Sequence, residues 1–458
     1  MISDDDKNRK PSVCIIGAGI TGLTAARQLS ALGYNVLVLE SALNSGGMLS
    51  AFNIGDELIE HIYHHIFTSD NEVLDLLDEL GLSTDMKWYT VRDALFAGGR
   101  NYPFSTPLDL MRFNELPLLQ RLKTGLTVLK AARLRDWHDL ENITAAQWLI
   151  ENCGQQAYNK LWQPLLRAKF DQDAEEVSAV WIWNKFKLRG SSRSGAKSIE
   201  RLGYLEGSFA RLTEALLQEL ADNGGRILYG YTAMGLSRFI APNGSHRYRV
   251  SSILEDCSSI DFDADAVIST ISARQFANLA ISLSLPEDYR EKLLSVRYKA
   301  NICMVLRLRH SLSPWYWNTI CDQLPFVVAV EHTNMTGING YGGHIVYLSR
   351  YLDLTDDVWT QSDGEIYHSF ITGLEHVYPD FSANDIIDWR LKRTRYAQPV
   401  VFRDYSSSMP GMDTPEPGIK LAGMAQIYPE DRGINYAVRL GNEAADSIVD
   451  YIRGSGQF

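Results

Sequence analysis

The 458-residue sequence contains few cysteines, carries an excess of negative charge and lacks a long apolar run. The cysteines are Cys14, Cys153, Cys257, Cys303 and Cys321. They are odd in number, far apart and without a CxxC pair, which argues against a disulfide framework or a zinc site. The formal net charge of −12 disfavours a nucleic-acid partner. Because no stretch of about 18 apolar residues occurs, a membrane-spanning helix is excluded.

The first ten residues also lack a recognisable targeting signal. The segment MISDDDKNRK is polar and runs directly into an apolar strand, unlike a secretory signal or a transit peptide. We therefore expect a cytoplasmic location. Hydrophobic residues make up 45% of the sequence and charged residues 22%, which is typical of a folded globular protein. The length favours two or more domains and leaves room for a large buried cavity.

The first forty residues predict a βαβ unit. Residues 12–17 (SVCIIG) form a short apolar run, residues 21–33 carry apolar positions at helical spacing, and residues 35–40 (NVLVLE) form a second apolar run. A strand, a glycine turn, a helix and a strand in this order build a parallel sheet. The fold class that we expect is therefore α/β.

A glycine fingerprint lies between this strand and this helix. In the segment GAGITG, Gly17 allows a tight turn, Gly19 lets the backbone approach a pyrophosphate, and Gly22 lets helix and strand pack closely. Ile20 and Thr21 begin the helix, whose N-terminus favours negative charge. The sequence thus predicts a dinucleotide site.

Glu40 ends the second strand, eighteen positions after Gly22. Its carboxylate can accept hydrogen bonds from both ribose hydroxyls of an adenosine. A 2′-phosphate would be repelled there, so NADP is disfavoured, and FAD and NAD remain as alternatives.

The residues after Glu40 resemble the FAD-binding amine oxidase superfamily. The motif of that family is an acid, a short loop and then Gly-Gly-Arg; here Ser41 opens the loop, and Gly46 and Gly47 match the two glycines. Met48 stands where the family usually has arginine, so pyrophosphate binding would rely more on backbone amides and the helix dipole. The resemblance implies FAD as the cofactor.

A second part of the family pattern lies between residues 421 and 449. The segment resembles the closing FAD motif, in which Gly423 ends a strand and Gly433, Ile434 and Asn435 begin the final helix. The resemblance implies that the N-terminus of this helix faces the flavin and stabilises negative charge on the reduced ring. Met234 is the candidate contact to adenine, because it falls in the strand that the family uses there.

The order of these segments is similar to that in protoporphyrinogen oxidase and phytoene desaturase relatives. The resemblance implies a Rossmann-like FAD-binding domain of the GR2 type, a second mixed-sheet substrate domain and a helical insert. We predict FAD-binding segments at 1–100, 196–275 and 411–458, a helical insert at 101–195 and a substrate-domain sheet at 276–410.

Three of the ten histidines lie within five positions, in the segment EHIYHHIFTSD. His65, Ile66 and Phe67 match a stretch of UDP-galactopyranose mutase that passes beside the flavin, which makes His64 and His65 candidate catalytic residues. Neutral imidazoles there could orient a substrate or accept a proton as hydride leaves. Packing under the cofactor is the alternative, for His61 as well. A metal is disfavoured, because no acid or cysteine cluster accompanies these histidines.

Arg350 and Tyr396 are further candidate catalytic residues, because both lie in predicted substrate-domain strands. Tyr347, Arg395 and Arg432 occupy similar strands or the flavin loop. An arginine in such a place could hold an anionic substrate by two parallel hydrogen bonds. A structural or surface role is the alternative for each of them.

Residues 116–134 mix Leu and Val with Arg121, Lys123, Lys130 and Arg133. This composition is compatible with a helix on a membrane surface or with a solvated helix that covers the active site. The acidic net charge favours the second interpretation. No feature of the sequence indicates an oligomeric state.

Three functions remain open. The leading one is an FAD-dependent oxidoreductase of oxidase, dehydrogenase or desaturase type, in which a small-molecule substrate gives hydride to flavin N5. The match at 65–67 favours a flavin-dependent sugar-nucleotide mutase as the alternative, and Met48 slightly favours a noncatalytic flavoprotein. Similar folds accept amines, porphyrinogens, polyenes and sugar nucleotides, so the fold does not identify the substrate.

Overall fold

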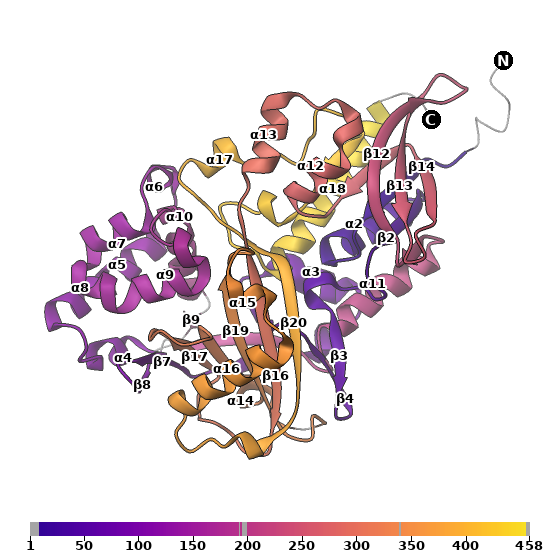
Figure 1. The fold of residues 1–458 in the computed structure, drawn as a ribbon. Coiled ribbons are helices and arrows are strands. Elements are labelled where there is room, and N and C mark those ends of the chain that lie inside the picture. Colours follow the sequence, from indigo (N-terminus) through magenta and orange to yellow (C-terminus); the bar gives the residue numbers. More distant parts are fainter. Residues whose placement is uncertain (1–8, 192, 195–198, 339, 455–458) are drawn as a thin grey trace.

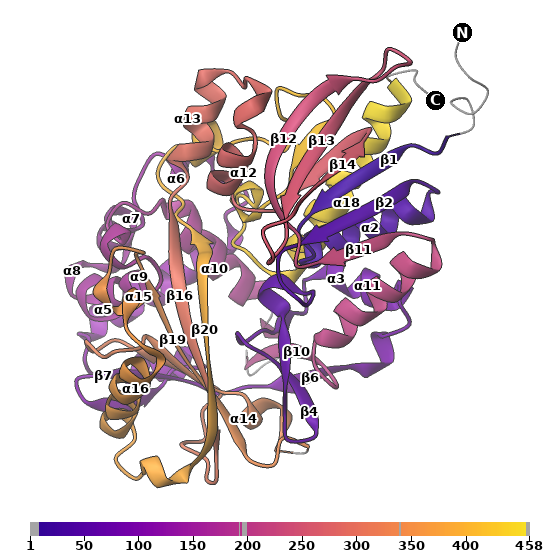
Figure 2. The same cartoon turned by 45° about the vertical axis from the view of Figure 1, so that its right-hand side comes forward.

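The computed structural model describes residues 9–191, 193–194, 199–338 and 340–454. Its centre is a five-stranded parallel sheet in the order β11-β2-β1-β15-β21 (Figures 1 and 2). The strands are short apolar runs from distant parts of the chain: β1 (Ser12–Ile16), β2 (Asn35–Glu40), β11 (Arg226–Tyr229), β15 (Ala266–Ser269) and β21 (Ile419–Leu421). Ile15 of β1 lies opposite Val38 on one side and Ile268 on the other. The predicted α/β class and βαβ unit are confirmed.

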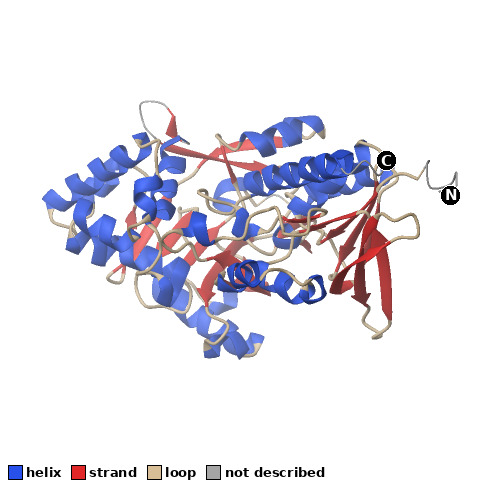
Figure 3. Ribbon diagram, turned by 90° about the horizontal axis from the view of Figure 1, so that it is seen from above, coloured by secondary structure: helices blue, strands red, loops and turns tan. Residues whose placement is uncertain are grey.

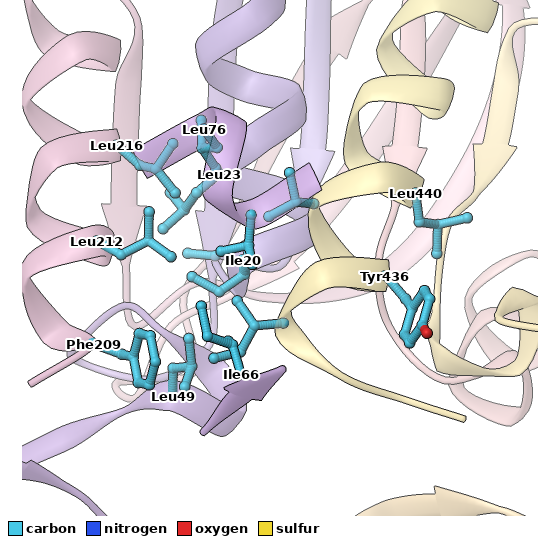
Figure 4. Close-up of a cluster of buried hydrophobic side chains, with 14 of the residues drawn as sticks. Ile20, Leu23, Leu49, Ile66, Leu76, Phe209, Leu212, Leu216, Tyr436 and Leu440 are labelled. Atoms are coloured by element: carbon cyan, nitrogen blue, oxygen red, sulfur yellow. The ribbon is translucent and has the colours of Figure 1, made fainter. Parts of the chain in front are cut away.

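Alternate residues of β1 face opposite sides of this sheet, as the two-residue period of a strand requires. Val13 and Ile15 pack against four helices, whereas Cys14 and Ile16 face a second apolar cluster. The four helices are α2 (Ile20–Ala31), α3 (Asn71–Glu79), α11 (Ala210–Asp222) and α18 (Ile434–Gly454). Figure 4 shows Ile20 and Leu23 of α2, Leu76 of α3 and Leu212 of α11 gathered beside the start of α2, together with Phe209, Leu49 and Ile66.

The other face of the parallel sheet is covered by an antiparallel meander and two helices (Figure 2). The meander consists of β12 (Thr232–Ile240), β13 (His246–Ile253) and β14 (Ser259–Ala264), and the helices are α12 (Ala273–Leu279) and α13 (Glu287–Ser295). Leu236, Val250 and Phe276 are buried in this layer. The strands before and after the meander, β11 and β15, both belong to the parallel sheet. The meander is therefore an insertion in the nucleotide-binding fold.

A seven-stranded mixed sheet forms the second large layer, in the order β20-β16-β19-β18-β17-β7-β8. Its strands are β7 (Asp93–Ala97), β8 (Arg100–Pro103), β16 (Tyr298–Leu308), β17 (Trp317–Ile320), β18 (Val328–Glu331), β19 (His344–Leu352) and β20 (Ile386–Pro399). One face packs on the nucleotide-binding side through Cys303 and Tyr347, and the other packs on α16 (Asp363–Val377). The predicted mixed sheet is confirmed, and the hairpin of β7 and β8 joins it from far upstream.

Residues 107–191 form a helical lobe at one end of the molecule, opposite the meander (Figures 1 and 3). Its helices are α4 (Pro107–Arg112), α5 (Leu118–Arg133), α6 (His138–Glu141), α7 (Ala145–Cys153), α8 (Gln155–Ala157), α9 (Gln163–Phe170) and α10 (Ala179–Ser191). Trp148, Trp162, Trp181 and Trp183 lie in the core of the lobe, as their spacing predicts. Among the described residues, no helix has both the length and the apolar composition needed to cross a bilayer.

Short strands connect these layers: β3 (Ala51–Ile54), β4 (Glu57–Glu60), β5 (Ile66–Phe67), β6 (Met86–Thr90), β9 (Arg193–Ser194) and β10 (Ile199–Leu205). Glu60 at the end of β4 is fully buried and accepts hydrogen bonds from Tyr204, Ser208 and the Phe209 N–H. This anchor fixes the start of the following loop. The predicted division at residues 195–196 lies outside the described residues, and the domain boundaries stay a prediction.

Candidate functional site

Two glycine loops meet at the N-terminus of α2. Gly17 has a φ of +104°, and a Cβ there would lie 2.5 Å from Thr270 Oγ1. A Cβ on Gly22 would lie 2.1 Å from the Gly17 carbonyl oxygen, so α2 packs on β1 at a distance that only glycine permits. The Gly46 N–H donates to the Ala18 carbonyl oxygen at 2.9 Å and holds the second loop against the first.

Gly19 faces open space between these loops. A Cβ on Gly19 would have no described atom within 4 Å, whereas a Cβ on Gly47 would lie 3.2 Å from Gly19 Cα. Gly19 is the N-cap of α2, and no described side chain caps the helix, so the N–H groups of its first turn, which includes Ile20 and Thr21, are available to a ligand. The two loops therefore form a cradle for an anionic group.

The Glu40 carboxylate lies beside the cradle. Its Oε2 accepts the Ala18 N–H at 2.7 Å, and its Oε1 accepts the Ala42 N–H at 2.8 Å and the Ser41 hydroxyl at 3.3 Å. These bonds orient the carboxylate and leave lone pairs for a ribose. Met48 packs against the core behind the second glycine loop, and Met234 on β12 is exposed.

The start of α18 lies next to the cradle. A Cβ on Gly441 would lie 2.6 Å from the Thr21 carbonyl oxygen, so the two helices touch through glycine. Asn435 Oδ1 accepts the Val73 N–H at 3.2 Å, which fixes the first turn of α18 to α3. Gly441 lies about 10 Å along the helix from Ile434 at a rise of 1.5 Å per residue. The helix N-terminus is thus held a short distance from the glycine loops.

Gly423 and Gly433 mark the two ends of the segment that leads into α18. A Cβ on Gly423 would lie 2.7 Å from the Ile271 carbonyl oxygen. The Gly423 N–H donates to Gln426 Oε1 at 2.8 Å. Gly433 precedes the first residue of α18 and is exposed. The predicted closing segment therefore adjoins the parallel sheet at one end and the helix at the other.

The histidine loop, residues 61–65, joins β4 to β5. His61 Nδ1 lies 2.9 Å from the Ser50 carbonyl oxygen, and His64 Nδ1 lies 2.7 Å from the Ile62 carbonyl oxygen. Each of these nitrogens therefore carries the proton, which leaves Nε2 as the acceptor of the neutral ring. His65 differs, because its Nδ1 lies 3.1 Å from a side chain, the hydroxyl of Tyr316.

Burial keeps two of these imidazoles neutral. Burial and the charge of Arg432 lower the pKa of His64 to about 4. Burial also lowers the pKa of His61, with the charge of Lys392 acting in the same direction. A neutral imidazole can accept a proton, as the sequence predicts for this loop.

A cation cluster, made of Lys169, Lys185 and Arg432, lies where the helical lobe meets the seven-stranded sheet and the segment before α18. Arg432 Nη2 donates to the Tyr351 hydroxyl at 2.5 Å, and Lys169 Nζ donates to the same hydroxyl at 3.3 Å. Burial opposes ionisation of Tyr351, but the charges of Arg432 and Lys169 outweigh burial and lower its pKa. The cluster is therefore strongly electropositive.

One carboxylate, Asp431, partly balances the cation cluster. Its Oδ2 pairs with Lys185 Nζ at 2.7 Å, and its Oδ1 accepts from Gln398 Nε2 at 2.9 Å. Gln398 also accepts from Arg432 Nε at 2.8 Å. Although burial opposes ionisation of Asp431, the three cations hold its pKa far below the usual range. Asp431 is thus ionised, and the cluster retains a surplus of positive charge.

The contacts that the structure describes for Arg350 and Tyr396 are with residues outside the histidine loop. Arg350 pairs with Asp356 at 2.9 Å and projects from the face of β19 opposite to Tyr351. Tyr396 packs edge-on against Tyr298, with ring centroids 5.4 Å apart. Their catalytic roles stay predictions.

Of the remaining candidates, Tyr347 is fully buried and donates to the Glu60 carbonyl oxygen at 2.8 Å. It therefore anchors the start of the histidine loop. Arg395 is exposed on β20. In the described part of the chain, His, Cys, Asp and Glu side chains do not gather in threes at any place that could hold a metal.

Comparison with known proteins identifies this arrangement. A family model described as flavin containing amine oxidoreductase matches residues 20–449. The chain belongs to this family. Membership confirms the resemblance that Glu40, Gly46 and Gly47 indicate, and it confirms FAD as the cofactor.

One known protein illustrates the sequence similarity, and two solved structures illustrate the similarity of fold. Amine oxidase B of Sus scrofa is 26% identical over 231 residues, which cover 46% of this chain and 43% of that enzyme. The match thus spans less than half of that enzyme. A provisional protoporphyrinogen oxidase of Exiguobacterium sp. 255-15 has a TM-score of 0.74 and 18% identity, covering 96% of this chain and 99% of that one. Reduced UDP-galactopyranose mutase has a TM-score of 0.71 and 15% identity, covering 98% and 96%.

The cradle fits the FAD of this family. Gly19 and Gly47 leave backbone exposed where a pyrophosphate would lie, and the Glu40 carboxylate is oriented for the adenosine ribose. With Met48 in place of the usual arginine, the backbone N–H groups at the start of α2 supply the positive end of a helix dipole. We assign the roles of these residues as proposals.

Sequence reasoning missed several residues of the site: Lys169, Lys185, Tyr351, Gln398, Asp431 and Gly441. Lys169 and Lys185 belong to helices whose spacing indicates only core packing. Gly441 is a glycine inside a predicted helix, and such a glycine is itself a signal of close approach. Asp431 stands next to Arg432, which the sequence did single out, so the pair could have been considered together.

Replacing His64 with glutamine should reduce the acid sensitivity of the fold. The ordinary pKa of histidine is 6.5 and that of folded His64 is about 4, so between these values the unfolded chain binds more protons. The contribution of His64 is therefore complete above pH 6.5 and is lost as pH falls toward 4, with a slope of up to about 1.4 kcal/mol per pH unit.

Thermal unfolding across this pH range tests the prediction. Stability of the wild type relative to His64→Gln should rise with pH, and His368→Gln, at an exposed histidine outside the loop, serves as the control. Parallel profiles for the wild type and His64→Gln would contradict the assignment of a buried neutral imidazole.

Proposed function

We propose that the protein is an FAD-dependent oxidoreductase that removes hydride from a small organic substrate bearing an anionic group. The observation that carries this proposal is the surplus positive charge of the cation cluster beside His64. Arg432 connects the two, because it contacts Tyr351 and lowers the pKa of His64. FAD supplies a two-electron acceptor when it is bound.

The charges of the cluster favour one substrate class over another. A carboxylate or phosphate would gain charge-assisted hydrogen bonds from Lys169 and Arg432. A protonated amine would meet two like charges at the same place, which costs several kcal/mol at short range in a protein interior. Cationic amines are therefore disfavoured as substrates, although amine oxidase B is a relative.

His64 is our candidate proton acceptor. Its Nδ1 proton is engaged by the Ile62 carbonyl oxygen, which leaves Nε2 free to take a proton. In the oxidation, a substrate C–H bond breaks as hydride leaves, and the neighbouring N–H, O–H or C–H proton passes to a base. His65 would orient the substrate. We also propose a cytoplasmic location for the protein.

Anaerobic flavin bleaching tests the proposal. The purified protein should contain FAD, and compounds of matched carbon skeleton should bleach it when they carry a carboxylate but not when they carry an amine. Bleaching by the amines alone would overturn the substrate class. Turnover only after dithionite reduction, without net redox change, would instead support the mutase. A purified protein without flavin would overturn all of these functions.

Replacing Lys169 with glutamine should weaken binding of the anionic substrate by about 10- to 100-fold, since a hydrogen bond to a charged group contributes about 1.5–3 kcal/mol. In steady-state oxidation assays, we expect KM to rise by this factor and kcat to change less. Lys160→Gln is a matched control in the same lobe, because Lys160 is exposed and pairs with Glu115. Equal KM values for the two variants would contradict a substrate contact of Lys169.

A further inference from the structure

We propose that the protein docks on an anionic lipid surface through an apolar face of its helical lobe. Five leucines of α5 are between 48% and 66% exposed: Leu118, Leu119, Leu122, Leu126 and Leu129. We call these residues the leucine face. The preceding helix, α4, packs on α5 at Gly125. It carries a further exposed leucine, Leu108.

The leucine face occupies one side of α5. At 100° per residue its members fall within an arc of about 100°, so they form one continuous stripe. The buried residues of the helix are Thr124, Thr127 and Ala131. α5 therefore buries threonines and exposes leucines, which inverts the usual pattern of a surface helix. The fold does not use these leucines for its own core, and a contiguous apolar patch of this kind marks an interaction site.

Positive charge lies along the edge of the leucine face. Residues 107–135 contain six arginines or lysines and two acidic residues, in a chain whose net charge is −12. Lys123 and Lys130 are exposed and lie on the same side of the stripe by helical spacing. Neither forms an ion pair with any residue in the described ranges. Their charges are available to a partner, and anionic headgroups complement them.

A second copy of the chain fits this face less well. In a two-fold dimer the same patch meets itself, so Lys123 and Lys130 would approach their own copies. A lipid surface accommodates both features, because leucines enter the acyl boundary while lysines remain at the headgroups. The helix would lie in the plane of the interface.

The proposal goes beyond the proposed function and does not depend on it. The two are nevertheless connected by the lobe, since Trp183 of α10 donates its indole N–H to the Leu134 carbonyl oxygen after α5 at 3.2 Å. Lys185 of the cation cluster lies on the same helix α10. The surface that contacts lipid is thus built on the lobe that contributes to the site.

Vesicle sedimentation of the flavin-loaded protein tests the proposal. The protein should pellet with phosphatidylcholine vesicles that contain one third phosphatidylglycerol, and less with pure phosphatidylcholine. Leu122→Gln, Leu126→Gln and Leu129→Gln together should lower the partition coefficient about a hundredfold, because each leucine loses its apolar burial. Lys123→Gln with Lys130→Gln should lower it about 30-fold on anionic vesicles only, and salt should mimic this loss.

Ile240→Gln with Ile281→Gln is the matched control, because both isoleucines are more than 60% exposed but lie outside the lobe. This variant should bind vesicles as the wild type does. Retention of FAD and of the helical circular dichroism shows that the leucine variant is folded. Wild type that stays in the supernatant, or a leucine variant that pellets equally, would overturn the proposal. The proposal would also be overturned if the wild type does not bind vesicles and instead forms a dimer that the leucine substitutions dissociate.

Discussion

Replacing Gly19 with aspartate should give a folded protein that no longer binds FAD. A Cβ at this position meets no described atom within 4 Å, and the backbone is extended, with φ of −75° and ψ of 176°, which any residue can adopt. Aspartate is also a favoured N-cap, so the stability of α2 should change by no more than about 1 kcal/mol. The fold therefore tolerates the substitution.

The loss of FAD follows from charge. The new carboxylate would occupy the open space of the cradle in which we propose that the pyrophosphate binds. Two like charges about 4 Å apart repel by about 4 kcal/mol at an effective dielectric constant of 20, which would weaken binding roughly a thousandfold. Flavin absorbance after purification and titration of the apoprotein with FAD measure the effect.

Two comparisons sharpen the Gly19 experiment. Gly364→Asp is a matched control, since Gly364 lies in the first turn of α16 and also has open space at its Cβ position. The apo forms should be compared with each other, because bound FAD itself stabilises the fold. Full FAD binding by Gly19→Asp would contradict the cradle as the pyrophosphate site. A protein that fails to fold would contradict the open space.

Replacing Lys299 with methionine should destabilise the molecule by about 3–5 kcal/mol. Lys299 is fully buried, and its Nζ pairs with Asp173 at 2.9 Å and Asp353 at 2.8 Å. Asp173 follows α9 in the helical lobe, and Asp353 follows β19. Without the lysine, buried Asp173 and partly buried Asp353 would remain near each other, and Asp173 would keep its ion pair with Arg297.

Thermal unfolding should show the Lys299→Met effect as a fall of about 3–5 °C in the melting temperature, given the entropy of unfolding expected for a chain of 458 residues. Adding Asp353→Asn to Lys299→Met should recover part of the loss, because one uncompensated carboxylate is removed. The surface pair of Lys160 and Glu115 is the control, and Lys160→Met should cost no more than about 1 kcal/mol. Equal melting temperatures for the two lysine variants would show that the buried network does not hold the lobe on the sheet.

The nucleotide-binding half could be predicted from sequence because its signals are local. Gly17, Gly19 and Gly22 fall within six residues, and the flanking runs have the periods of a strand and a helix. The seven-stranded sheet was harder to predict. β20 is fourteen residues long but only partly buried, so it lacks an apolar run, and β7 pairs with β17 across more than two hundred residues. Such pairing leaves no local pattern.

The site was predictable on its cofactor side and much less so on its substrate side. Backbone geometry at the cradle demands glycine, and glycine is visible in a sequence. The cation cluster instead arises where α9, α10, β19 and the segment before α18 meet, and no spacing rule links Lys169 to Arg432. His64 was singled out by the density of histidines in its segment, and its role stays a prediction. Arg350 lies on a strand, as predicted, and projects from the face opposite to Tyr351.

The parallel sheet joins strands that are made at very different times. Ser12 of β1 bonds to Asp265, 253 residues later, and β21 follows only at residue 419. At synthesis rates of about 5–20 residues per second, the ribosome needs roughly 20 to 80 seconds between β2 and β21. Until β15 is synthesised, β1 has one unpaired edge, and β15 then has an unpaired edge until β21 follows. Chaperones that shield strand edges should therefore raise the yield of flavin-loaded protein in cells more than added riboflavin does.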